Sequence, residues 1–239
     1  MAQTSRELVI RCLTLQTPER MPRDLWVLPW AEHHFPETVA EISRRFPNDI
    51  ITAEYAYPPL PCVSGDPYRI GTYVDEWGSI FTNIQDGVIG EVRTPLLPDI
   101  TDWQSLQPPY AQLPQGRQRQ QALDEIKRFH DHTDRFVMAN ACPRPWERYQ
   151  FIRGSENSYL DIMMPESGTL DLLRLIHEFY MRELEFWVKT DVDGIKFMDD
   201  WGAQKQLLIP PRLWREYFKP LYKEYCDLAK AHGKWVFMH

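Results

Sequence analysis

The feature that most constrains the fold is a unit of turn, short apolar run and polar residues that occurs near the C-terminus. Asp193-Gly194 supplies the turn, and the run 195–198 has the length of a strand. Asp199 and Asp200 follow directly. An unpaired buried carboxylate costs roughly several kcal/mol, so two adjacent acids at the end of a buried strand predict catalytic or ligand-facing groups. The alternative is a capped strand end with both acids in water.

The unit occurs a second time at the end of the chain, where the strand 235–238 is followed by His239. A helical stretch, 210–232, separates the two strands. Alternating strands and helices predict a parallel α/β sheet. Functional groups at the carboxyl ends of such strands are typical of an α/β barrel.

Composition excludes several classes of protein. The 239 residues are 43% hydrophobic and 26% charged, which is typical of a globular protein with one large domain or two small ones. A net charge of -7 with no basic stripe argues against nucleic acid. The sequence has no run of about 18 apolar residues, so it predicts no membrane span. The first residues are not typical of a signal peptide. The four cysteines are far apart and form no CxxC pair, which favours a reduced, cytoplasmic protein.

The remaining segments extend the strand–helix alternation. We predict five barrel strands, at 25–28, 50–55, 136–140, 195–198 and 235–238, and helices at 5–15, 36–46, 115–130, 151–164 with a break near Gly154, 170–189 and 210–232. Residues 66–97 are instead rich in β-formers, with a strong hairpin signal at Asp86-Gly87. We interpret them as a β-hairpin insertion that covers part of the mouth of the main domain.

Candidate site residues follow the predicted strands. Glu54 and Tyr55 end the second strand, and the loop after the first strand holds Trp30 and the adjacent His33 and His34. Adjacent histidines point to different sides of a helix or strand, so they form a poor joint metal site.

Further candidates are charged or aromatic. Arg144 and Arg148, just past the third strand, are suited to an anionic substrate group, or else lie solvated in a surface loop. Glu76-Trp77 in the insertion echoes Asp200-Trp201, so both could line one pocket. Tryptophan side chains such as Trp30, Trp77 and Trp201 are typical of small-molecule sites, although they also pack in ordinary cores.

These segments together resemble the uroporphyrinogen decarboxylase superfamily, which includes cobalamin-dependent methyltransferases such as methylcobalamin:coenzyme M methyltransferase. The resemblance covers nearly the whole chain, and its best-matching pieces are 147–154, 191–194, 199–202, 208–214 and 218–220. It implies a (β/α)8 TIM-type barrel, formed as one domain over 1–239, with the site at the C-terminal ends of the strands.

Two departures refine the resemblance. The decarboxylases carry arginines after the first strand, whereas 29–35 has none, which argues against porphyrinogen decarboxylation. The family has eight strands and this chain five, so we expect that a C-terminal part is missing. The resemblance implies that His239 is the first ligand of a zinc ion whose other ligands would lie beyond the sequence, and that zinc would activate a thiol acceptor.

Three functions remain open. The first is a methyltransferase that moves a methyl group between a corrinoid on a partner protein and a small acceptor, with Asp199, Asp200 and Glu54 as catalytic residues. We predict that Trp30, His33, His34, Tyr55, Glu76, Trp77, Arg148 and Trp201 contact the substrate. The second is a metal-free decarboxylase or lyase of the same fold. The third is a non-catalytic binding partner of a corrinoid protein. The fold alone does not distinguish these three functions, because one fold can carry many of them.

Overall fold

A row of four parallel strands organises the molecule. The structure, a computed structural model, describes residues 2–239. The strands lie in the order β1–β5–β6–β7 and all three neighbouring pairs are parallel. Their bounds are β1 Ile50–Thr52, β5 Phe136–Met138, β6 Gly194–Phe197 and β7 Trp235–Met238. The predicted parallel α/β sheet is therefore confirmed, whereas closure into a barrel stays an expectation.

The first of the five predicted strands, 25–28, is wrong. This segment is extended, but it forms no strand. The N–H of Leu25 donates to the side chain of Asn48 at 2.8 Å, where a strand would pair with a neighbouring backbone. The Trp26 ring packs instead on Phe237 and His239, with ring centroids 5.6 and 5.4 Å apart. The apolar run therefore reflects side-chain packing at the end of β7.

Helices alternate with the strands as the sequence predicts. Their bounds are α1 Ser5–Leu13, α2 Pro29–His34, α3 Pro36–Arg45, α4 Gly116–Asp131, α5 Pro145–Arg153, α6 Ser155–Met163, α7 Thr169–Trp187, α8 Pro211–Leu213 and α9 Lys219–Ala231, with short 3-10 helices η1 Ile100–Ser105 and η2 Tyr110–Gln112. The predicted break near Gly154 separates α5 from α6, and this glycine has a φ of 73°. Thr4 and Glu7 form a reciprocal capping box that fixes the start of α1.

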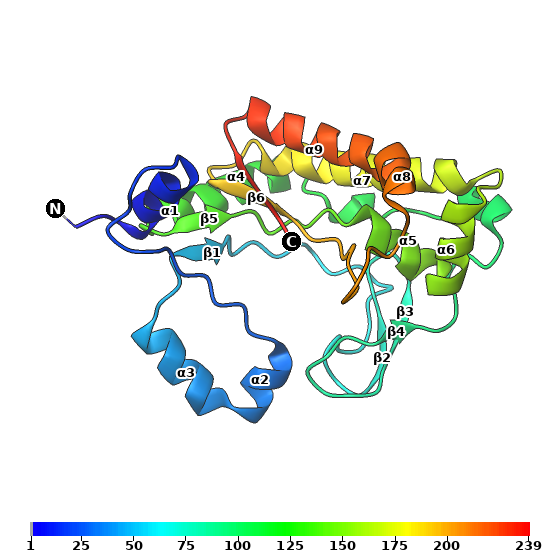
Figure 1. Ribbon diagram of the computed structural model, residues 1–239, viewed down its shortest axis with the longest axis horizontal. Coiled ribbons are helices and arrows are strands. Elements are labelled where there is room, and N and C mark those ends of the chain that lie inside the picture. Colours follow the sequence, from blue (N-terminus) through cyan, green and yellow to red (C-terminus); the bar gives the residue numbers. More distant parts are fainter. Residues whose placement is uncertain (1) are drawn as a thin grey trace.

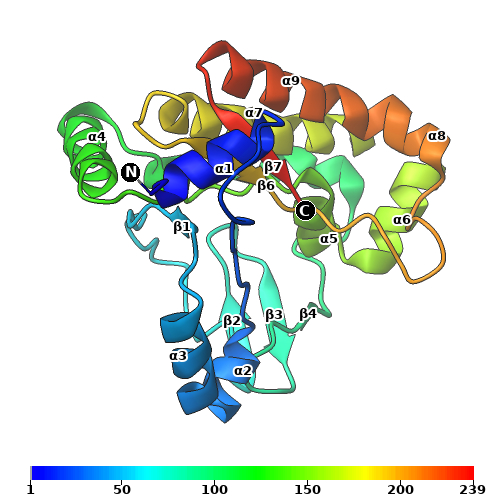
Figure 2. The same ribbon diagram turned by 60° about the vertical axis from the view of Figure 1, so that its left-hand side comes forward.

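A wide π-type turn, η3 (Trp214–Phe218), joins α8 to α9. Pro220 follows it and has no N–H for the regular helical bond, which accounts for the local widening. α7 and α9 lie side by side above the sheet in Figures 1 and 2. No helix in residues 2–239 combines the length and apolar character that crossing a bilayer requires.

The core lies between the sheet and these helices. Leu172, Ile176 and Leu184 of α7 are fully buried, as are Ile195 of β6 and Tyr225 of α9. Each buried aliphatic side chain contributes about 1.5–3 kcal/mol. The 3- and 4-residue spacing of the apolar positions in 170–189 predicts this buried face of α7.

The predicted insertion is confirmed as a separate antiparallel sheet. Its strands are β2 Gly71–Val74, β3 Ile80–Asn83 and β4 Glu91–Val92. It projects in the same direction as α2 and α3, away from α7 and α9 (Figure 1). At its tip, Gly87 has a φ of 79° and accepts a hydrogen bond from the N–H of Trp30 at 3.1 Å. An added Cβ would lie 2.2 Å from the Cα of Trp30, so this contact between insertion and α2 requires glycine.

Candidate functional site

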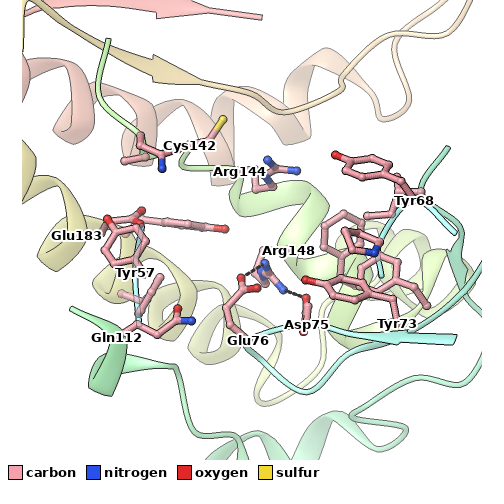
Figure 3. Close-up of a pocket in the computed structure, with 18 residues that line it drawn as sticks. Tyr57, Tyr68, Tyr73, Asp75, Glu76, Gln112, Cys142, Arg144, Arg148 and Glu183 are labelled. Carbon is pink, nitrogen blue, oxygen red and sulfur yellow. Dashed lines mark hydrogen bonds and ion pairs between the residues drawn. The ribbon is translucent and has the colours of Figure 1, made fainter. Parts of the chain in front are cut away.

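A cavity of about 400 Å³ lies beyond the carboxyl ends of β1 and β5. Its walls come from the loops after these strands, from α5 and α7, and from the antiparallel sheet (Figure 3). This volume suits a small organic molecule. The lining combines ionisable side chains with many aromatic rings, and its main members are Tyr57, Tyr68, Tyr73, Asp75, Glu76, Phe81, Gln112, Cys142, Arg144, Arg148, Phe151, Phe179, Tyr180 and Glu183.

The turn between β2 and β3 forms one wall of the cavity through Asp75 and Glu76. Asp75 accepts hydrogen bonds from the backbone N–H groups of Trp77 and Ser79, at 3.0 and 2.8 Å. Arg148, on α5, pairs with Asp75 and donates to Glu76 at 2.7 Å. Its guanidinium lies 5.2 Å from the ring centre of Trp77. The insertion is thereby held on α5 by a buried charge network, which stabilises the cavity wall.

Glu183 is an acid of the cavity whose pKa is strongly raised. It lies on α7 with 7% of its surface exposed. Burial raises the pKa of this carboxyl group to about 7, although a hydrogen bond from Tyr57 lowers it. The Tyr57 hydroxyl also accepts a 2.6 Å hydrogen bond from Trp187 Nε1, which fixes its orientation. Glu183 therefore gains or loses a proton near neutral pH, as a general acid or base must.

One oxygen of Glu183 has no partner. Oε2 is buried and makes no hydrogen bond to any of the described residues 2–239. A buried polar atom without a partner costs about 1–3 kcal/mol. Such an atom on a cavity wall is therefore a natural contact for a bound molecule.

Arg144 and Cys142, which follow β5, line the wall between the Glu183 side and the Tyr68 side of the cavity (Figure 3). Burial raises the pKa of Cys142 to about 11, so this thiol is protonated and a poor nucleophile near neutral pH. The Arg144 side chain is 30% exposed, and its Nη1 lies 3.8 Å from Glu147 Oε2. Asn140 fixes this loop by donating to the backbone oxygen of Tyr55 at 2.7 Å.

The structure brings only some of the predicted site residues together. Glu76 and Arg148 line the cavity. Trp77 is buried behind it and packs edge-on against Phe179, with ring centroids 5.1 Å apart. Tyr55 turns away to pack on Trp187 at 6.0 Å.

The other candidate on this strand end, Glu54, is exposed and lines none of the described pockets. The residue after β1 that lines the cavity is Tyr57, two residues after Tyr55, and a functional role for Glu54 and Tyr55 stays a prediction.

Asp199 holds the end of β6 against α5. It is 1% exposed and accepts hydrogen bonds from the N–H groups of Trp146 and Glu147, both at 2.8 Å, and from the Tyr222 hydroxyl. Burial raises the pKa of Asp199 to about 7 against the lowering effect of these donors. Trp201 continues the same packing and stacks on Trp146 at 5.7 Å. Both residues lie outside the cavity lining.

Asp200 and His239 meet at the ends of β6 and β7. Asp200 Oδ1 lies 3.3 Å from His239 Nδ1, and both side chains are largely exposed, at 66% and 47%. The polar residues that follow these two neighbouring strands thus lie close together. Trp26 stacks on the imidazole, with an interplanar angle of 22°.

This pair does not by itself form a zinc site. No group of three or more His, Cys, Asp or Glu side chains with metal-binding geometry occurs among residues 2–239. A catalytic zinc ion requires three protein ligands, and Asp200 and His239 provide two. The assignment of His239 as a metal ligand therefore remains a prediction.

The remaining predicted residues lie on α2. Trp30 stacks on His34 at 4.5 Å, and His34 Nδ1 lies 2.8 Å from the Trp30 backbone oxygen. His33 is exposed. None of the three lines the cavity, so a substrate contact there would need a surface other than the one described.

Glu183 is the functional candidate that the sequence analysis missed. The signal is a carboxyl group inside an apolar helical stripe, because Tyr180, Leu184 and Trp187 stand at 3- and 4-residue distances from one another or from Glu183. A glutamate on the buried face of a helix is uncommon unless it is paired or used. Arg144 was considered together with Arg148, and the structure adds it to the cavity.

Comparisons with known proteins agree with the fold. No protein-family model matches the sequence, and no curated protein matches it. Among solved structures, a methyltransferase from Methanosarcina mazei is similar, with a TM-score of 0.55 and 14% sequence identity. The match covers 99% of this chain and 69% of that protein. At this identity the likeness shows that the chain has the fold of that methyltransferase.

Proposed function

We propose that this chain is a methyltransferase-type enzyme that acts on a small acceptor bound beside Glu183. The observation that carries the proposal is a buried carboxyl group with a pKa of about 7 and an unpartnered oxygen on the wall of a 400 Å³ cavity. The fold that the chain shares with a methyltransferase supports the reaction class. Following the sequence analysis, we propose a corrinoid on a partner protein as the methyl carrier.

The proposed step needs a base at the acceptor. The methyl group forms a bond with the lone pair of the acceptor atom, and the electron pair of the broken bond stays on the donor. The acceptor proton passes to the Glu183 carboxylate, whose pKa the Tyr57 hydroxyl lowers. A base whose pKa lies near the working pH is effective at this transfer, and base catalysis contributes about 10²–10⁴-fold.

The other groups of the cavity bind and orient. Arg144 provides a cation whose ion pair with Glu147, at 3.8 Å, is longer than a hydrogen bond, and Arg148 holds the insertion in place through Asp75 and Glu76. Zinc, which the resemblance implies, would lower the pKa of a thiol acceptor. The described residues do not complete its ligand set, so the step above is assigned only to residues of the cavity.

A decarboxylase or lyase is the second candidate. A protonated Glu183 could donate its proton to the carbon that loses carbon dioxide, and Arg144 could bind the departing carboxylate. The two functions differ in their products, since only methyl transfer consumes a methyl donor and only decarboxylation releases carbon dioxide.

The test is an assay of the purified chain with methylcobalamin and separate thiol, phenol, amine and carboxylic acid acceptors. Methylcobalamin consumption is followed by absorbance, and carbon dioxide release is measured in parallel. We expect acceptor-dependent consumption that Glu183→Gln lowers by about 100-fold. Glu185→Gln is the matched control, because Glu185 is on the same helix but exposed and outside the cavity.

Two results would contradict the proposal. Equal consumption by the wild type and Glu183→Gln would remove Glu183 from the reaction. Carbon dioxide release without methyl consumption would favour the lyase.

A further inference from the structure

The cavity has two chemically different ends. Figure 3 shows Glu183 and Tyr57 at one side, Tyr68 and Tyr73 at the other, and Arg144 along the wall between them. Glu183 offers an oxygen without a partner, which accepts or donates one hydrogen bond. Arg144 offers a planar set of donors that suits a carboxylate. A ligand that satisfies both must carry an acid group and a separate polar group.

Arg144, and not Arg148, is the arginine available to an acid group of a ligand. Two carboxylates, Asp75 and Glu76, already pair with Arg148. Arg144 forms an ion pair with Glu147 at 3.8 Å, which is longer than a hydrogen bond, so its N–H donors are left for a ligand. One carboxylate on a ligand would therefore find these donors, whereas a second would meet Asp75 and Glu76, which already share Arg148.

The walls between these ends are aromatic. Seven rings line the cavity: Tyr57, Tyr68, Tyr73, Phe81, Phe151, Phe179 and Tyr180. Several are packed on one another, as in Tyr73 with Phe81 at 5.8 Å and Phe81 with Phe151 at 5.0 Å. Such rings present flat faces and edges that favour stacked or edge-on contact with another ring. A flat ligand therefore contacts these walls better than a puckered one of the same size.

We propose that the cavity binds a flat aromatic acid with one negative charge, with its carboxylate on Arg144, its ring between the aromatic walls, and a hydroxyl or similar group at Glu183. The inference rests on the proposed function, because it names the class of molecule that would serve as acceptor. It concerns binding alone, so it is tested without turnover.

The experiment is calorimetric titration of the full chain with four probes. 4-Hydroxybenzoate carries all three features. Benzoate lacks the hydroxyl, 4-hydroxybenzamide lacks the charge, and cis-4-hydroxycyclohexanecarboxylate lacks the flat ring. We expect 4-hydroxybenzoate to bind most tightly. Removal of the charge or of the hydroxyl weakens binding by about tenfold or more, and replacement of the ring weakens it by about threefold or more.

Substitutions at Arg144 locate the acid group. Arg144→Gln is expected to weaken 4-hydroxybenzoate by about tenfold or more and to leave 4-hydroxybenzamide within about twofold. Arg174→Gln is the matched control, since Arg174 is exposed on α7 and outside the cavity. Arg144→Lys keeps the charge and is expected to recover part of the affinity. Thermal melting of each variant confirms that it is folded.

The outcomes separate this inference from the proposed function. No binding of 4-hydroxybenzoate, equal binding of the saturated acid, or an unchanged affinity in folded Arg144→Gln would overturn it. Binding without any methyl transfer would contradict the proposed function and leave this inference standing. Methyl transfer to an acceptor that 4-hydroxybenzoate does not displace would support the proposed function and contradict this inference.

Discussion

Glu183 and Asp199 are both buried carboxyl groups whose pKa burial raises to about 7, yet their surroundings differ. Asp199 accepts hydrogen bonds from Trp146, Glu147 and Tyr222, and it joins the end of β6 to α5 and α9. Glu183 has an oxygen without a partner on the wall of a cavity. A raised pKa therefore marks both sites, but only the unsatisfied group is available to a ligand. The number of partners, more than burial, separates a structural acid from a functional one.

The largest expected effect is the loss of stability in Asp199→Ala. The substitution leaves two buried N–H groups at the start of α5 without an acceptor, which costs about 4 kcal/mol in the free energy of unfolding. Urea denaturation measures it. Glu183→Gln is the comparison and is expected to lose no stability at pH 7, because a neutral amide avoids the cost of a buried charge. Similar losses in both variants would break the contrast between the two acids.

The second effect is the pH dependence of stability. The ordinary pKa of a glutamate is 4.5, and in the folded chain that of Glu183 is about 7. Between these values the folded state keeps a proton that the unfolded state has released. This contribution is therefore complete below about pH 4.5 and is lost as the pH rises through 7, by about 3 kcal/mol in all.

Glu183→Gln should remove that pH dependence, because glutamine stays neutral as the protonated glutamate does. Unfolding free energies of the wild type and the variant, measured from pH 4.5 to 7.5, should be similar near pH 4.5 and separate as the pH rises, with the wild type becoming the less stable protein. Asp199, which titrates in the same direction, remains in both proteins. Parallel pH profiles would show that Glu183 is ionised throughout this range.

A smaller effect is expected from Tyr57→Phe. The hydroxyl lowers the pKa of Glu183, so its removal should move the acid limb of the pH–activity profile to higher pH by about one unit. Tyr55→Phe is the matched control, because the Tyr55 ring packs on Phe186 and Trp187 outside the cavity. An equal change in both profiles would argue against a specific bond between Tyr57 and Glu183.

The smallest effect on stability is expected from Asp200→Asn. The Asp200 side chain is 66% exposed, and its contact with His239 is open to solvent. The free energy of unfolding should change by less than about 0.5 kcal/mol. Turnover is the sharper measurement here, because a loss of activity at unchanged stability would place Asp200 in the reaction, as the sequence predicts.

Local patterns account for most of the fold that could be predicted. The apolar spacing of 170–189 predicts α7, and the alternation of strand and helix around 195–198 and 235–238 predicts two parallel strands of one sheet. The strand prediction for 25–28 is wrong because an apolar run does not show whether its backbone pairs with another strand. Its backbone bonds to the side chain of Asn48, and its tryptophan packs on β7.

The site was harder to predict, because strand ends indicate where functional groups gather and not which of them are satisfied. Glu76 and Arg148 were found, since charged residues in a turn and after a strand are visible in the sequence. Glu183 was missed because the helix that carries it is recognised by the spacing of its apolar residues, and that spacing says nothing about a charged residue among them. Asp199 was predicted at a strand end, as observed, but its three hydrogen-bond donors come from residues 52, 53 and 23 positions away.

The sequence by itself determined the alternation of helices and strands, the antiparallel insertion and the polar groups after the strands, because periodicity and turn residues act over a few positions. Only the tertiary structure decided which carboxyl group is enclosed by donors and which faces a cavity. That difference depends on the approach of α5, α7, α9 and the insertion, which are distant in the chain. Burial and hydrogen bonding set the pKa of each acid, and both are properties of the packed molecule.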